Sequence, residues 1–232
     1  MKRFYKEVQV IEAQGGWSVA LDGKPIRTPA KTPFVAQTAA MAEAAAEEWR
    51  AQEAEVKPAE MPVTKAVNSA IDRTAVEYEG VVEMVAGYGG SDLLCYRADG
   101  PEGLIARQAE AWDPLLLWAA KAHGARLLTT TGVMHALQPE DGQRALRAAV
   151  AAHDPFELTG LYDLVALSGS LVIGLAVSSG RLSPEEGWTI SRIDETWQEE
   201  FWGVDEEAAK VAARKAGEFA AAARFVELAR RK

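Results

Sequence analysis

The sequence predicts an α+β protein, in which a small N-terminal β-sheet domain with one helix precedes a larger all-helical domain. Prolines and paired turn glycines interrupt the first thirty-six residues, which favours strands and turns there over helices. Beyond a proline-containing stretch that ends at Pro62, helical periodicity dominates the chain. We place the boundary after Pro58, which gives predicted domains of residues 1–58 and 59–232.

The predicted strands lie on either side of two tight turns. The segments FYKEVQVI (residues 4–11) and WSVAL (residues 17–21) flank a turn at Gly15-Gly16, and Asp22-Gly23 is a second hairpin signal. The segments PIRTP and PFVA, within residues 25–36, continue in extended form because their prolines are incompatible with a helix interior.

Helices are predicted for most of the remaining chain. Thr38 is a suitable N-cap for the segment TAAMAEAAAEEWRAQ, which is rich in alanine and glutamate. Only residues 125–133 of the second domain have β character. The further predicted helices cover residues 63–87, 103–122, 139–153, 164–177, 183–202 and 205–231.

Composition excludes several classes of protein. The formal net charge of -9 argues against a nucleic-acid-binding protein, which needs a basic face to neutralise phosphates. The most apolar run, Leu164–Val177, is shorter than the ~20 residues of a membrane span, so we expect no membrane insertion. Cys95 is the one cysteine, which excludes an intramolecular disulfide and a cysteine-based metal cluster, and we expect it to be a small core residue.

Sequence signatures of catalysis are missing. The segment Gly169–Gly174 resembles a phosphate-binding loop but lacks the following Lys-Ser or Lys-Thr, so we expect it to pack helices through small residues. The histidines His123, His135 and His153 are isolated and show no metal-ligand spacing. We therefore expect no catalytic site, no cofactor and no metal, and predict that the protein is not an enzyme.

The predicted helix over residues 183–202 has well-defined ends and one apolar stripe. It begins with Ser183 as N-cap and Pro184 at the first helical position, and Gly203 ends it. Asp205 is then the expected cap of the next helix. On a helical wheel the apolar stripe, which we expect to face the core, consists of Ile190, Ile193, Trp197 and Phe201.

A second stripe on this helix combines aromatic and acidic residues. Trp188, Glu195 and Trp202 are spaced seven apart and lie nearly opposite the core stripe, with Arg192, Gln198 and Glu199 beside them. One interpretation is structural: the helix packs on two faces and Glu195 pairs with a buried Arg or Lys. The other is a protein-binding surface, in which tryptophans anchor a partner and charges orient it. The helix by itself leaves both interpretations open.

Seven segments in register along nearly the whole chain form a recognisable set. The segments are GWSVALDGKPIRTPA, AEEWRAQ, EMPVTKAVNSAIDR, SDLLCYR, QAEAWDPLLLW, SGSLVIGLA and DETWQEEFWGVDEEA. In this order and spacing they resemble the family of assembly chaperones of the catalytic (F-one) sector of ATP synthase that serve its alpha subunit.

The resemblance implies a non-enzymatic chaperone that binds the free ATP synthase alpha subunit and prevents its aggregation until the beta subunit replaces it. It also implies a small sheet domain before a helical one. An important acidic position of the family corresponds to Glu195, flanked by Asp194, Trp197 and Gln198. Gly187 departs from expectation, because a stronger helix former would stabilise the first turn before Trp188 by up to ~1 kcal/mol.

From the resemblance and the helical wheel together we expect a monomeric protein of the bacterial cytoplasm, with organelle relatives in the mitochondrial matrix. Two alternatives remain: a hydrolase-type or transferase enzyme that uses the Glu195 carboxylate cluster, and a general helical scaffold. The enzyme alternative predicts a deep pocket that pairs Glu195 with a carboxylate from another helix. The predicted partner-binding residues are Trp188, Asp194, Glu195, Gln198, Glu199 and Trp202.

Overall fold

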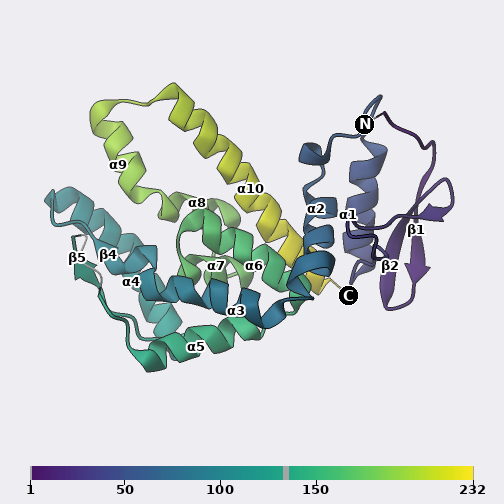
Figure 1. Ribbon diagram of the computed structural model, residues 1–232. Coiled ribbons are helices and arrows are strands. Elements are labelled where there is room, and N and C mark those ends of the chain that lie inside the picture. The colour runs from purple at the N-terminus through teal and green to yellow at the C-terminus, as the bar shows by residue number, and fades with distance from the viewer. Residues whose placement is uncertain (1, 133–135, 232) are drawn as a thin grey trace. The chain divides into compact units, whose positions relative to one another are not determined.

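The computed structural model describes residues 2–132 and 136–231, so His135 and the last residue of the predicted β segment lie outside the described residues. The chain forms two compact units. Unit 1 contains Met1–Tyr78, His153–Gly160 and Arg224–Lys232. Unit 2 contains Glu79–Ala152 and Leu161–Ala223. Figure 1 shows the small sheet near the N-terminus and the many helices that follow, which confirms the α+β class. The sequence division after residue 58 stays a prediction.

The N-terminal sheet is an antiparallel meander of β1 (Val8–Ala13), β2 (Gly16–Leu21) and β3 (Lys24–Pro25). Gly15 in the first turn has φ of +88°, and the second turn consists of Asp22 and Gly23, both at positive φ. Both predicted turns are therefore confirmed, and positive φ explains why glycine occupies them.

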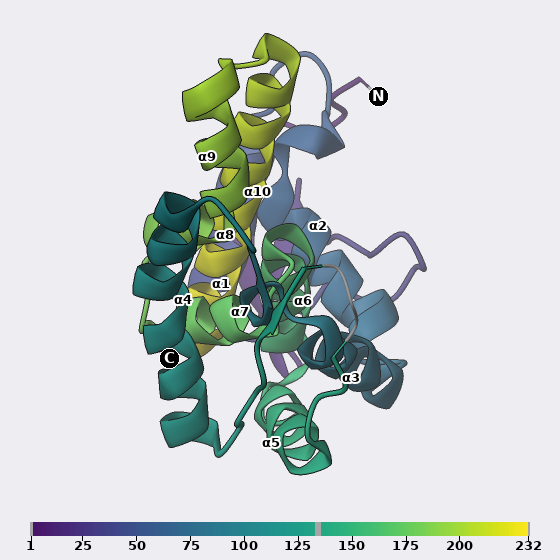
Figure 2. The same ribbon diagram turned by 90° about the vertical axis from the view of Figure 1, so that its left-hand side faces the viewer.

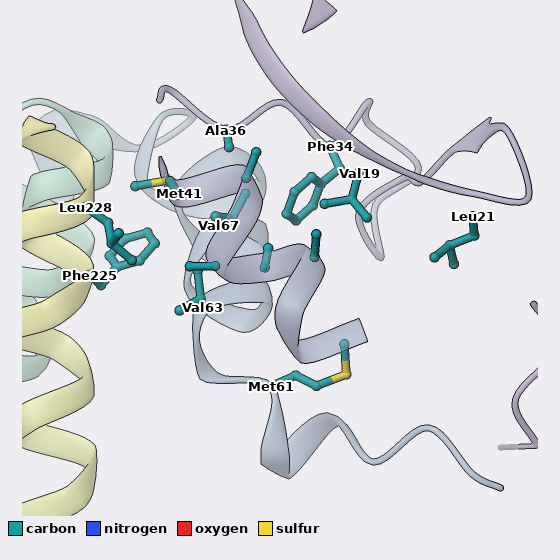
Figure 3. Close-up of a cluster of buried hydrophobic side chains, with 14 of the residues drawn as sticks. Val19, Leu21, Phe34, Ala36, Met41, Met61, Val63, Val67, Phe225 and Leu228 are labelled. Atoms are coloured by element: carbon teal, nitrogen blue, oxygen red, sulfur yellow. The ribbon is translucent and has the colours of Figure 1, made fainter. Parts of the chain in front are cut away.

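The core of unit 1 packs this sheet against helices from distant parts of the chain. Figure 3 shows Val19 and Phe34 on one side of α1 (Ala39–Arg50), with Val63 and Val67 of α2 (Pro62–Ser69) beside it. Residues Phe225 and Leu228, near the C-terminus, complete the cluster (Figure 3).

Thr38 caps α1 as predicted and also ties it to the chain's end. Its hydroxyl accepts a bond from the Met41 amide at 3.1 Å and donates one to the Leu228 carbonyl at 2.7 Å. The Thr38 hydroxyl thus accepts a hydrogen bond from a free amide at the start of α1 and donates one to a carbonyl near the C-terminus.

The helix predicted over residues 63–87 is interrupted, so its continuity was wrong. A π-helical turn, Ala70–Thr74, follows α2, and α3 (Tyr78–Gly87) begins after it. Within the turn, Asp72 accepts hydrogen bonds from the Thr28 hydroxyl at 2.7 Å and the Ala30 amide at 3.0 Å. These long-range bonds to an N-terminal loop are invisible to helical periodicity.

Among the described residues of unit 2, the regular secondary structure is helical apart from one short parallel pair of strands. That pair joins β4 (Tyr96–Arg97) to β5 (Thr130–Thr131), which places the β character predicted for residues 125–133. The remaining helices are α4 (Glu102–His123), α5 (Glu140–Ala151), α6 (Pro155–Ser168), α7 (Leu171–Ser178), α8 (Pro184–Ser191), α9 (Ile193–Trp202) and α10 (Glu206–Arg230). The final residues of α10, from Arg224, belong to unit 1.

The apolar run Leu164–Val177, predicted as one helix, is divided between α6 and α7. Gly169 adopts φ of +70° and Ser170 caps α7, its hydroxyl accepting a bond from the Ile173 amide at 3.0 Å. Asp92, fully buried, accepts bonds from the Ser170 hydroxyl at 2.8 Å and the Val172 amide at 3.0 Å. Burial raises the pKa of this Asp92 carboxyl despite these bonds.

Small residues do pack α6 against α7, as predicted for the Gly169–Gly174 segment. A Cβ atom on Gly174 would lie 2.5 Å from Val165 Cγ2 and 3.4 Å from Leu161 Cδ1. No larger residue fits at this approach.

Gly187, the departure noted above, has a similar packing reason. A Cβ atom there would lie 2.5 Å from Val177 Cγ2 and 3.3 Å from the Phe219 ring. The close approach of α7, α8 and α10 in unit 2 therefore requires glycine, even though glycine weakens the helix itself.

We predict opposite effects for two glycine-to-alanine substitutions. Gly187→Ala should lower the free energy of unfolding by about 1–3 kcal/mol, because a core side chain must shift to admit the new methyl group. Gly217→Ala, in the matched control, should raise it by up to about 1 kcal/mol, since nothing lies within 4 Å of that Cβ position. Urea denaturation followed by circular dichroism measures both. A stabilised Gly187→Ala variant would contradict the packing explanation.

Candidate functional site

The predicted helix over residues 183–202 is two helices, α8 and α9, separated at Arg192. Arg192 leaves helical geometry, with φ of -114° and ψ of 20°, so one helical wheel cannot describe both halves. Trp188 is consequently not in line with Glu195 and Trp202. It is half-buried against Phe219, with ring centroids 5.8 Å apart.

One face of α9 packs on α4 (Figure 2). The Trp197 ring lies against Gly103, where a Cβ atom would be only 2.7 Å from Trp197 Cη2. The guanidinium of Arg107 lies over the same ring, 4.8 Å from its centroid, and donates bonds of 2.8 and 2.9 Å to the two carboxylate oxygens of Glu200. These bonds lower the pKa of the Glu200 carboxyl. Trp197 therefore fixes α9 to unit 2, as its position in the predicted core stripe suggested.

Asp194 takes part in this packing rather than in the exposed surface. The buried Gln108 side chain of α4 donates a 2.6 Å hydrogen bond to Asp194 Oδ1 and accepts a 2.9 Å bond from the Ala98 amide. One turn further along α4, the indole N–H of Trp112 donates to the Ile190 carbonyl at 3.0 Å. The end of α8 and the start of α9 are thus held by polar contacts that α4 supplies.

Phe201 was predicted in the core stripe, and this prediction was wrong. The residue is 63% exposed, and its ring stacks on Trp197 with centroids 4.8 Å apart. Asp194 contacts Gln108 and Trp197 contacts Gly103, so α9 runs antiparallel to α4 and Trp197 already lies against its first turn. One turn further along α9, no part of α4 remains to cover Phe201.

A groove of about 480 Å³ lies between the other face of α9 and the first turns of α10. The two helices are joined by the short loop 203–205 (Figure 1). Asp205 ends this loop and caps α10 as predicted, its carboxylate accepting bonds from the Glu207 and Ala208 amides. The α9 wall of the groove contains four of the six predicted partner-binding residues, namely Glu195, Gln198, Glu199 and Trp202.

The α10 wall consists of small apolar side chains and one cation. Ala208, Val211 and Ala212 line the groove, and Lys215 lines it one turn later. The sequence offered one signal for this wall: a three-residue loop between two helices favours antiparallel neighbours. The pattern of α10 itself did not identify it, because alanines occur along the whole helix.

Arg192 is a charged residue of the groove, which the helical wheel placed beside the aromatic and acidic stripe. Its guanidinium lies in the groove and bonds Glu195 at 3.3 Å and Glu199 at 3.5 Å, both long for hydrogen bonds between charged groups. It also lies 5.8 Å from the centroid of the Trp188 ring. Glu195 is therefore exposed and loosely paired, not enclosed in a core ion pair.

Exposed apolar side chains surround the loop end of the groove. Trp202 is 80% exposed, and Phe201 and Val204 are each 63% exposed. Large aromatic side chains in such positions are typical of binding surfaces rather than of a solvated helix end.

Other candidate sites have structural explanations. Cys95 is fully buried, and burial, with the nearby Asp92 carboxylate, raises the pKa of its thiol to about 12.

Among the described residues, no group of three or more His, Cys, Asp and Glu side chains is placed to hold a metal ion. Within the described chain, no helix combines the length and apolar character needed to cross a membrane.

Comparison with known proteins assigns the chain to a family. A family model described as ATP12 chaperone protein matches residues 2–120. The chain belongs to the ATP12 chaperone family. The resemblance found in the seven sequence segments is thereby confirmed.

Two solved structures are similar to nearly the full length of this chain. The crystal structure of Atp12 from Paracoccus denitrificans is 47% identical, with a TM-score of 0.95, and the match covers 99% of this chain and 98% of that one. The Atu1473 protein of Agrobacterium tumefaciens is 43% identical, with a TM-score of 0.94 over 97% of this chain and 85% of that one. Mitochondrial Atp12 of Schizosaccharomyces pombe is 22% identical over 224 residues, which are 90% of this chain and 76% of that protein.

We predict that Cys95 in this ATP12 protein is inert in the folded state. Its pKa of about 12 lies above the ordinary thiol value, so at mildly alkaline pH the unfolded chain forms thiolate and the folded chain does not. Alkylation by iodoacetamide should be negligible in buffer and complete in denaturant, as measured by mass spectrometry. Rapid labelling of folded protein would refute this assignment.

Asp194 and Glu195, adjacent in sequence, should differ in their contribution to stability. Asp194→Ala leaves the buried Gln108 amide without its acceptor, which should cost about 1–3 kcal/mol and accelerate hydrogen exchange in α9. Glu195→Ala removes only an exposed ion pair, which is worth about 0–1 kcal/mol. Urea denaturation and amide exchange by mass spectrometry measure both effects. Equal losses of stability would contradict the assignment of Asp194 to the packed face of α9 and of Glu195 to the exposed face.

Proposed function

We propose that this protein is an assembly chaperone of the ATP synthase catalytic head that binds the free alpha subunit as a monomer. It holds the subunit in soluble form until the beta subunit takes its place. Membership of the ATP12 chaperone family is the observation that carries the proposal. The family assigns the class of function, and the alpha subunit as partner is our inference from the sequence resemblance.

The groove between α9 and α10 is the proposed binding surface. It combines an apolar wall with exposed aromatic residues and with two carboxylates, Glu195 and Glu199, that among the described residues are paired only with Arg192 at the groove. A mixed apolar and charged surface suits a reversible grip, since a chaperone must later release its client. We assign Glu195, Gln198, Glu199 and Trp202 to direct contact with the alpha subunit. Asp194 and Trp188 position the helices that carry these side chains.

The enzyme alternative has weaker support. A carboxylate from another element, Asp205, does share the groove with Glu195, but its oxygen accepts two amide bonds at the start of α10. Glu195 and Glu199 both pair with Arg192 and lie one turn apart on the same helix, whereas an acid–base pair usually needs carboxylates from separate elements. We therefore propose a protein-binding function without catalysis, in the cytoplasm of a bacterium like those of its structural relatives.

Co-expression with the host's ATP synthase alpha subunit, in the absence of beta, tests the proposal. Wild-type protein should increase soluble alpha subunit and co-purify with it. Glu195→Lys and Trp202→Ala should each reduce co-purified alpha subunit at least about tenfold, as expected for residues at the centre of an interface.

Glu140→Lys is the matched control for the charge reversal. Glu140 is an exposed helical glutamate that pairs with an arginine one turn away on α5, far along the chain from the groove. This variant should retain full capture. Loss of capture in the control as well, or capture by none of the proteins including wild type, would contradict the proposal.

A further inference from the structure

The end of the α9–α10 hairpin concentrates negative charge. Residues 192–207 contain seven carboxylates and a single basic residue, Arg192. Two of the carboxylates accept hydrogen bonds from side chains of α4: Asp194 from Gln108 and Glu200 from Arg107. Asp205 is used as the α10 cap. The carboxylates that line the groove without a bond to another helix are those of Glu195 and Glu199.

These two carboxylates share one guanidinium, that of Arg192, at 3.3 and 3.5 Å. A guanidinium that satisfies a carboxylate fully makes two short, parallel bonds, as Arg107 does with Glu200 at 2.8 and 2.9 Å. The Arg192 arrangement is longer and divided between two acceptors. Each carboxylate therefore retains acceptor capacity directed at the groove.

Apolar contact is available directly beside these acceptors. The α10 wall of Ala208, Val211 and Ala212 faces the carboxylates across the groove, and Trp202 stands at its loop end. A segment that binds here would place an apolar side chain on the α10 wall and a cation between Glu195 and Glu199.

We infer that the groove recognises a segment of the alpha subunit that carries a lysine or arginine beside a large apolar side chain. Arg192 occupies the cation position in the free protein and competes with the basic residue of the client. This inference rests on the proposed function and specifies the chemistry of the client segment.

Competition gives Arg192 and Glu195 effects of opposite sign. Arg192→Gln removes a positive charge from the neighbourhood of the incoming cation and frees both carboxylates, so the complex should tighten by about fivefold. Arg192→Lys keeps the charge and should tighten the complex less than Arg192→Gln does. The double variant Glu195→Gln, Glu199→Gln keeps the side-chain size, removes the charge, and should weaken the complex by about tenfold or more.

Salt-dependent dissociation measures these effects on the intact complex. The complex, formed by co-expression and immobilised through a tag on the alpha subunit, is washed with rising NaCl while the released protein is quantified. Wild-type protein should leave at intermediate salt, Arg192→Gln at higher salt, and the double variant at lower salt with a shallower dependence. Arg144→Gln is the control, because it breaks only an exposed ion pair with Glu140 on α5. This variant should dissociate at the same salt concentration as wild-type protein.

A set of synthetic peptides that tile the alpha-subunit sequence identifies the segment. Peptides that bind wild-type protein should contain Lys or Arg next to an aromatic or large aliphatic residue. Replacement of that basic residue by Gln should abolish their binding, measured by fluorescence polarisation.

The outcomes separate this inference from the function on which it rests. If no complex with the alpha subunit forms, the proposed function fails and the inference falls with it. If the complex forms but is insensitive to salt, or if Arg192→Gln weakens it while folding normally, the chaperone function stands and the competition mechanism is overturned.

Discussion

The packing of Trp197 on the first turn of α4 is the interaction on which the candidate site depends. The ring fits only because residue 103 is glycine, and the Arg107 guanidinium lies over the ring. This contact packs one face of α9 on α4, so that the opposite face lines the groove. Asp194 and Glu200 strengthen this packing by accepting hydrogen bonds from Gln108 and Arg107 of α4. An acidic helix is thus divided into a structural face and an open face.

That division resolves why one helix carries both tryptophans and carboxylates. Trp197 and Asp194 contact α4 through packing and a hydrogen bond to a buried amide, whereas Trp202 and Glu195 are exposed at the groove. Charged groups at exposed positions cost little stability and remain available to a partner. The two interpretations left open by the helical wheel therefore apply to different residues of the same helix.

Breaks in helices account for most of the difference between predicted and observed secondary structure. Residues 164–177 and 183–202 each have continuous helical periodicity, yet Gly169 and Arg192 leave helical geometry. At the first break, the buried Asp92, seventy-eight residues earlier in sequence than Ser170, helps to cap the new helix. Periodicity reports which side chains are apolar and cannot report a cap that arrives from a distant loop.

The sequence by itself determined the fold class, the tight turns of the sheet, the caps Thr38, Ser183 and Asp205, and the family. Each of these depends on local chemistry: a glycine at positive φ, a side chain within three residues of an amide, or motifs read in order. Only the tertiary structure decided that Asp194 and Trp188 lie away from the groove, that Phe201 is exposed, and that α10 supplies the second wall. The positions of Asp194 and Phe201 depend on where α4 begins and that of Trp188 on Phe219 of α10, and contacts between such remote residues leave no trace in local sequence. The short loop between α9 and α10 favoured antiparallel neighbours, but only the structure shows which residues of α10 line the groove.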